Sequence, residues 1–155
     1  MNQANVSQNL FKQLEGAEQG HQLALTDLLD AVRFNADGLL PAIAQQHDSG
    51  EVLMMAWMNR EALRETLDTG RVCYYSRSRG KLWRKGESSG QQQHLKSAAL
   101  DCDGDTLLLQ VEQTGPACHS GRRSCFYVAL EPGSQRARIT STPLIDPAEL
   151  YAKER

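Results

Sequence analysis

The run Val52-Leu-Met-Met-Ala-Trp-Met58, followed by Asn59 and the segment Arg60–Thr69, decides the fold class of this chain. The run is apolar and has the length of a strand, so it predicts one. Asn59 is a favoured helix N-cap, the leucines of the next segment recur on one helical face, and Gly70 is a typical helix stop. The stretch therefore predicts a strand that passes directly into a helix.

Outside this stretch, strands outnumber helices. Apolar positions at helical spacing predict a helix over residues 23–34 with Thr26 as its N-cap, and Pro147 begins a short terminal helical turn. The other expected strands are 72–76, 98–100, 107–111, 124–130 and 136–140. Because no βαβ alternation repeats, we expect an α+β fold: a β-dominated small mixed or antiparallel sheet, or a barrel-like core, with one or two helices.

Composition and charge narrow the possible functions. The chain has 155 residues, enough for one domain, and a formal net charge of −2, which favours neither nucleic acid nor an anionic membrane as a partner. No apolar run has the length of a membrane span. Residues 1–22 are polar and lack the order of a signal peptide. We therefore expect a tail over 1–22, a single domain over 23–155 and a cytoplasmic location.

The motif Asp101-Cys-Asp-Gly-Asp105 gathers acidic side chains. Its carboxylates, on Asp101, Asp103 and Asp105, alternate along the chain, and in a strand they would share one face. Carboxylate oxygens suit a hard cation such as Mg²⁺ or Ca²⁺. An EF-hand is disfavoured, because Thr106 stands where that loop needs glycine and a strand-like run follows.

The cysteines favour metal binding or core packing over disulfides, because the expected compartment is reducing. Cys73 lies in a strand-like run and is expected to be a small buried hydrophobe. Cys102, Cys118 and Cys125 suit an open zinc site with three protein ligands, although three unrelated core cysteines would give the same pattern. His119 is a candidate fourth ligand or general base, and as a surface histidine it would need no function.

A third cluster combines basic side chains with hydroxyls and glycines. It runs from Tyr74 to Arg79 and from Leu82 to Gly90. Arginines at alternating positions beside hydroxyl groups suit phosphate contacts. A solvated edge strand followed by a polar loop would have the same composition.

Taken together, these motifs resemble those of the phosphoribosyl-AMP cyclohydrolases, enzymes of histidine biosynthesis. The resemblance runs from about Phe34 to Tyr127 and keeps the family's motif order. The segments are Phe34-Asn35, Gly38-Leu-Leu-Pro-Ala-Ile43, Val52 to Asn59, Tyr75-Ser-Arg-Ser-Arg79, Leu82-Trp-Arg-Lys-Gly-Glu-Ser-Ser-Gly90, Asp101 to Asp105, Gly115-Pro-Ala-Cys-His119 and Ser124-Cys-Phe-Tyr127. Gln91 departs from the family, which usually has His or Asn there. Few residues follow Tyr127, so a form without the second, pyrophosphohydrolase domain of some members is expected.

The resemblance implies an activity and a set of ligands. The activity is hydrolytic opening of the adenine ring of phosphoribosyl-AMP at its N1–C6 bond, carried out by a homodimer. Zinc is implied on Cys102, Cys118 and Cys125, drawn from both subunits, and magnesium on Asp101, Asp103 and Asp105. Candidate substrate contacts are Arg77, Arg79, Trp83, Lys85, Glu87, Ser88 and Ser89, and the candidate base is His119.

Two rival functions can be compared with this one. Three thiolates would leave a zinc site with a net negative charge and a weakly acidified water, which makes a nearby base such as His119 useful. A non-catalytic zinc module would instead use His119 to close the coordination shell, but the acidic and basic clusters would then have no role. A zinc nucleoside deaminase is excluded because its H-x-E and P-C-x-x-C motifs are absent.

Overall fold

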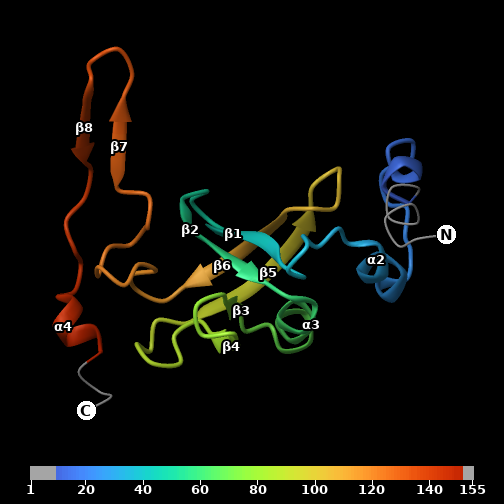
Figure 1. The fold of residues 1–155 in the computed structure, drawn as a ribbon, viewed down its shortest axis with the longest axis horizontal. Coiled ribbons are helices and arrows are strands. Elements are labelled where there is room, and N and C mark those ends of the chain that lie inside the picture. Colours follow the sequence, from blue (N-terminus) through green and yellow to red (C-terminus); the bar gives the residue numbers. More distant parts are fainter. Residues whose placement is uncertain (1–9, 152–155) are drawn as a thin grey trace.

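A four-stranded sheet in the order β2-β1-β6-β5 forms the centre of the computed structural model, which describes residues 10–151 (Figure 1). Its strands are β1 Leu40–Gln46, β2 Val52–Met58, β5 Gln93–Leu100 and β6 Leu107–Gln113. β1 pairs antiparallel with β2 and parallel with β6, and β6 pairs antiparallel with β5. This mixed sheet confirms the expected fold class.

Side chains on one face of the central strands form the hydrophobic core. Along both β1 and β6, buried positions alternate with less buried ones, as in strands that turn one face to the interior. Their buried side chains join those of β2 and α3 in one cluster, which includes Leu40, Leu53, Met58, Leu63 and Leu109. Burial of an aliphatic side chain of this size contributes about 1.5–3 kcal/mol, so the cluster holds sheet and helix together.

The strand-to-helix stretch folds as its sequence predicts. β2 ends at Met58, and α3 spans Arg60–Thr69. The Asn59 side chain accepts a hydrogen bond from the backbone N–H of Ala62 at 2.8 Å and so caps the helix. Gly70 ends α3 with a φ of 76°, a left-handed conformation that glycine adopts with little strain.

A hairpin of β3 Cys73–Ser76 and β4 Lys81–Arg84 lies beside α3 (Figure 1). Cys73 is fully buried and donates its backbone N–H to Thr66 Oγ1 at 2.9 Å, which confirms it as a core residue. β4 was not among the expected strands, because its sequence is polar and lacks β-branched residues. Both strands lead into loops that line the site described below.

The C-terminal strands form a separate ribbon that projects away from the central sheet (Figure 1). β7 spans Val128–Glu131, β8 spans Arg136–Ile139, and α4 follows at Pro147–Leu150. The strand expected at 124–130 therefore begins late. The preceding residues are held irregularly along the edge of β2, where Cys125 N–H donates to the Leu53 carbonyl at 2.7 Å.

The helix before the sheet, α2, spans Leu25–Ala31 and is shorter than expected. The prediction of Thr26 as its N-cap is wrong: the cap residue is Ala24, which makes no side-chain cap bond. The helix ends at Ala31, because the backbone is extended at Val32. The next residue, Arg33, donates its N–H to the Gly104 carbonyl at 2.8 Å. This bond ties the end of α2 to the turn between β5 and β6.

Part of the predicted tail packs on the domain. Residues 10–14 are helical, and Phe11 is only 8% exposed. The Phe11 ring lies so close to Gly104 that a Cβ at that position would overlap it. Residues 1–9 of the predicted tail and 152–155 of the predicted domain lie outside the described residues. The boundary between tail and domain stays a prediction.

Candidate functional site

A cavity of about 360 Å³ lies at the end of the β3–β4 hairpin. Two loops form its walls: one follows β4, and the other, which we name the thiol loop, comprises residues 115–125. Its lining residues include most of the candidate substrate contacts together with the candidate base. They are Met54, Ser76, Ser78, Arg79, Trp83, Arg84, Lys85, Gly86, Glu87, Ser88, Ser89, Ala117, His119, Cys125 and Tyr151.

The polar wall of this cavity is shaped by a tight loop after β4. Gly86 has a φ of 86°, and a Cβ there would overlap the backbone of Gln91 and Gln92, so the loop can close only with glycine. The amide of Gln91 donates to the Ser89 carbonyl at 3.4 Å. The substitution at position 91 thus retains a hydrogen bond within the loop.

Arg77 differs from the other candidate substrate contacts. It does not line the cavity, and its guanidinium carbon lies 4.9 Å from the centroid of the Trp57 ring. Arg84, which lines the cavity, was not among the candidates. It forms a bidentate ion pair with Glu65 of α3 at 2.8 and 2.6 Å. Arg84 therefore anchors the hairpin to the helix.

Two candidate zinc ligands are neighbours in the thiol loop. Burial raises the pKa of Cys118, but hydrogen bonds from the hydroxyl and backbone N–H of Ser120 outweigh it and lower the pKa overall. Burial and the adjacent Cys118 raise the pKa of Cys125 to about 12. The two thiols thus behave as a pair that holds one negative charge more easily than two. Ser120 carries no motif that would have revealed this role.

The thiol loop is held in place by Arg123. Its guanidinium donates to the carbonyls of Gln113 at 2.9 Å and Gly115 at 2.7 Å, and to Gln46 Oε1 at 2.7 Å. These bonds join the loop to the ends of β1 and β6. Arg123 follows Arg122 in a polar segment and gave no sequence signal for this function.

The acidic motif forms a turn. The sharing of one face by alternating carboxylates, which a strand would give, therefore does not apply to it. The turn, residues 101–105, curls because Asp101 Oδ1 accepts from Asp105 N–H at 3.0 Å and the Asp101 carbonyl accepts from Gly104 N–H at 3.1 Å. Ligand oxygens of Asp101, Asp103 and Asp105 lie within 4.8 Å of one another, and all three residues are exposed. Partial burial and the two neighbouring carboxylates raise the pKa of Asp105. A cation would relieve this repulsion.

Phe11 offers a test of how this turn is supported. Replacing Phe11 by Ala removes the ring that packs on Gly104, so the turn should loosen and should hold the Mg²⁺ predicted from its sequence less tightly. A loss of about 10-fold is expected, the lower end of the range seen when support around a metal ligand is lost. Magnesium titration by calorimetry measures it, with Gln13→Ala, an exposed and uncharged change in the same helix, as control. Equal affinity in both variants would contradict the supporting role of the ring.

Cys102 lies far from the other two candidate zinc ligands. It sits in the acidic turn before β6, whereas the thiol loop follows β6, and Figure 1 shows these segments at opposite ends of the strand. A strand of 7 residues spans roughly 20 Å, so one chain does not bring the cysteines together. No group of three that includes Cys118 and Cys125 within ligand distance occurs among residues 10–151.

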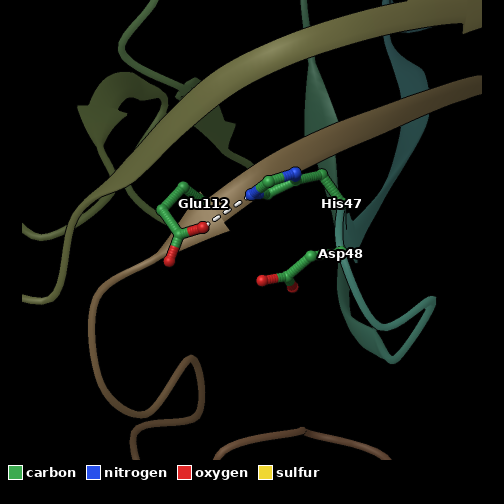
Figure 2. A group of neighbouring side chains, drawn as sticks. All are labelled: His47, Asp48 and Glu112. Carbon is green, nitrogen blue, oxygen red and sulfur yellow. Dashed lines mark hydrogen bonds and ion pairs between the residues drawn. The ribbon is translucent and has the colours of Figure 1, made fainter.

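Another charged cluster, not foreseen from sequence, closes the end of the sheet next to the thiol loop (Figure 2). His47 Nε2 lies 2.7 Å from Glu112 Oε2, and Asp48 lies beside them. The amide of Gln46, 4% exposed, donates to Asp48 at 3.0 Å and to Glu112 at 3.1 Å, and its oxygen accepts from Arg123. Because Asp48 and Glu112 both accept from the Gln46 amide, they fix its orientation, and we interpret the cluster as a support for Gln46 and, through it, for Arg123.

No helix within residues 10–151 combines the length and apolarity needed to cross a bilayer.

Comparison with known proteins identifies the family. A family model described as phosphoribosyl-AMP cyclohydrolase matches residues 54–127. The phosphoribosyl-AMP cyclohydrolase of Chromohalobacter salexigens is 73% identical over 92% of this chain and 97% of its own length. Those of Halorhodospira halophila and Alcanivorax borkumensis are 65% and 62% identical, over 92% and 93% of this chain and 99% and 100% of their own lengths. Identity and coverage of this extent show that the chain belongs to the phosphoribosyl-AMP cyclohydrolase family.

Proposed function

We propose that this chain hydrolyses the N1–C6 bond of the adenine ring of phosphoribosyl-AMP in histidine biosynthesis, with zinc and magnesium as its metals. The observation that carries the proposal is one cavity lined by Arg79, Trp83, two loop serines, His119 and Cys125. Such a lining combines phosphate donors, an aromatic face, a base and a metal ligand. Membership of the family supplies the substrate that fits this combination.

The acidic turn fits magnesium. Its carboxylate oxygens lie close enough to share one ion, and their mutual repulsion favours a cation. We assign Asp101, Asp103 and Asp105 as the residues that would hold it.

The thiol pair fits part of a zinc site. Cys118 and Cys125 supply two adjacent sulfurs, and the exposed Cys102 of a second subunit would supply the third. Zinc bound there would supply the Lewis acidity that makes water nucleophilic at neutral pH. Because the ligands are free thiols, we place the enzyme in the cytoplasm, where thiols stay reduced.

The side chains of the cavity have distinct roles in this proposal. Arg79 and the serines of the loop after β4 bind the phosphates and riboses, and Trp83 stacks on the base. Exposed His119, on the cavity wall, accepts the proton of the attacking water and returns it to the ring nitrogen that departs. Glu87 lines the same wall and is assigned to a ribose hydroxyl.

The β7–β8 ribbon supports the proposed homodimer. Its Val128, Leu130 and Ile139 are 55%, 79% and 55% exposed, and Phe126 just before it is 62% exposed. A two-stranded ribbon is marginally stable alone in water, and a patch of exposed apolar side chains marks an interaction surface. A second copy of the chain that covers the ribbon would bury this patch.

The direct test is turnover. Purified protein incubated with phosphoribosyl-AMP should open the ring, followed by ultraviolet absorbance, and a zinc chelator should stop the reaction. No turnover by the metal-loaded protein would refute the proposed function.

A substitution in the acidic turn should weaken magnesium binding without affecting zinc binding. Asp103→Asn removes one carboxylate charge, so the magnesium concentration for half-maximal rate should rise on the order of tenfold while zinc stays bound. Zinc content by mass spectrometry and a magnesium titration of the rate measure the two effects. Asp37→Asn, at an exposed turn elsewhere, is the control. Loss of zinc from Asp103→Asn would show that the two sites are not separate.

A further inference from the structure

Lys85 is a buried cation without a carboxylate partner in the described part of the chain. It is 8% exposed, and none of the ion pairs within residues 10–151 includes it. Lysine is rarely buried this deeply unless its charge is compensated. Its Nζ donates to the Ala117 carbonyl at 2.8 Å, directly before Cys118. The ammonium is thus engaged by the thiol loop, although the sequence suggested a phosphate contact.

The groups placed to compensate this charge are the two thiols. Lys85 and Cys125 line the same cavity, and the Ala117 carbonyl that accepts from Lys85 directly precedes Cys118. Burial lowers the pKa of Lys85, whereas negative charge on Cys125, and then on Cys118, raises it.

The neighbouring cation on β4, Arg84, is already paired with Glu65 of α3. Arg122 also lowers the pKa of Cys118, but its guanidinium lies over the Tyr127 ring and donates to the Ser141 carbonyl. Lys85 is therefore the buried cation that the fold places beside the thiol pair.

We propose that Lys85 is a positioning residue of the zinc site, which balances the charge of the bound thiolates and holds the backbone that carries Cys118. The inference rests on the proposed zinc site and deepens it. Three thiolates and Zn²⁺ carry a net charge of −1, and a buried ammonium beside them makes the assembly neutral. A neutral assembly costs less to bury, so zinc should bind more tightly with Lys85 than without it.

The test compares variants of the full-length protein that separate charge from hydrogen bonding. Lys85→Met removes both, Lys85→Gln removes the charge but keeps an N–H donor, and Lys85→Arg keeps the charge. Lys81→Met, at an exposed position of β4, the strand that ends just before Lys85, is the matched control. Zinc affinity is measured by competition with a chromogenic chelator at constant neutral pH. The variants are also loaded with Co²⁺ to record the sulfur-to-cobalt charge-transfer band.

Zinc affinity should fall about 10–100-fold in Lys85→Met and Lys85→Gln, the range seen when a residue that supports a metal ligand is lost. It should be largely retained in Lys85→Arg and unchanged in Lys81→Met. The charge-transfer band should move to lower energy in the two uncharged variants, because their sulfur electrons lose a stabilising cation. A purely structural role would leave the band in place.

Two results would overturn the inference: wild-type affinity in a folded uncharged variant, or an equal loss in Lys85→Arg and Lys85→Gln. If Lys85→Met does not fold, the Gln and Arg variants decide the question by the same two measurements. A wild-type protein that binds no zinc would instead refute the zinc site itself, so the two failures are distinguishable.

Discussion

Mixing two inactive variants, Cys102→Ser and Cys125→Ser, should restore activity if the zinc site is shared between subunits. Each variant alone lacks one ligand in both of its sites. A mixed dimer has one site that draws Cys102 from one chain and the thiol pair from the other, so that site is intact. Recovery of up to about a quarter of wild-type activity is expected when half of the dimers are mixed and each has one working site.

The structure makes this outcome a sharp test of the dimer. Cys102 and the thiol loop lie at opposite ends of β6, so no small movement within one chain joins them (Figure 1). Subunit exchange is verified by native mass spectrometry of differently tagged chains, and activity is measured before and after exchange. Mixing Cys118→Ser with Cys125→Ser is the control, because both ligands belong to the same loop and no intact site can form. Mixed dimers without activity in the first pair would contradict the shared site.

Gly121→Ala should open the thiol loop and lower stability. Gly121 has a φ of 84°, and a Cβ there would overlap the carbonyl oxygen of Ile145. The segment 144–145 is held close to Gly121, because Leu144 N–H donates to the Gly121 carbonyl at 2.8 Å. Gly121 N–H in turn donates to the Cys118 carbonyl at 3.0 Å. Alanine adds backbone strain and forces these segments apart, so zinc should also bind more weakly.

The expected loss of unfolding free energy is about 3 kcal/mol, which for a chain of this size lowers Tm by roughly 6–12 °C. Gly133→Ala is the matched control: its φ is 77°, but nothing lies within 4 Å of the added Cβ. It therefore reports the cost of the backbone conformation alone. Calorimetric melting at equal protein concentration and zinc titration measure both variants. Equal Tm values for the two variants would contradict the steric overlap expected at Gly121.

Local signals explain which parts of the fold could be predicted. Asn59 and Gly70 act within one turn of the helix that they bound, so the limits of α3 follow from sequence. The parallel pairing of β1 with β6 depends on residues far apart in the chain, and no local pattern encodes it. β5 begins at Gln93, earlier than expected, because pairing with β6 draws a polar segment into the sheet.

The candidate site also has parts that local sequence indicates and parts that only the tertiary structure reveals. Cysteines and aspartates indicate metal chemistry by their residue type, and the order of the family's motifs along the chain indicates how they are grouped. The supports around them could not be predicted, because Ser120, Arg123 and Lys85 are ordinary polar residues until the fold places them beside the thiol loop. Sequence thus suggests the candidate ligands, and tertiary contacts reveal what orients them.

The parallel ladder between β1 and β6 has a consequence for the order of folding. β1, β2 and α3 are consecutive and can pair soon after synthesis, whereas β6 must close a loop back to β1 across the intervening hairpin. Closing so long a loop is entropically costly, and proteins rich in non-local pairings fold slowly. The thiol loop is anchored to the ends of both strands, so it becomes ordered only after this step. Chains still awaiting β6 expose their cysteines to oxidation, and reductant during refolding should raise the yield of native protein.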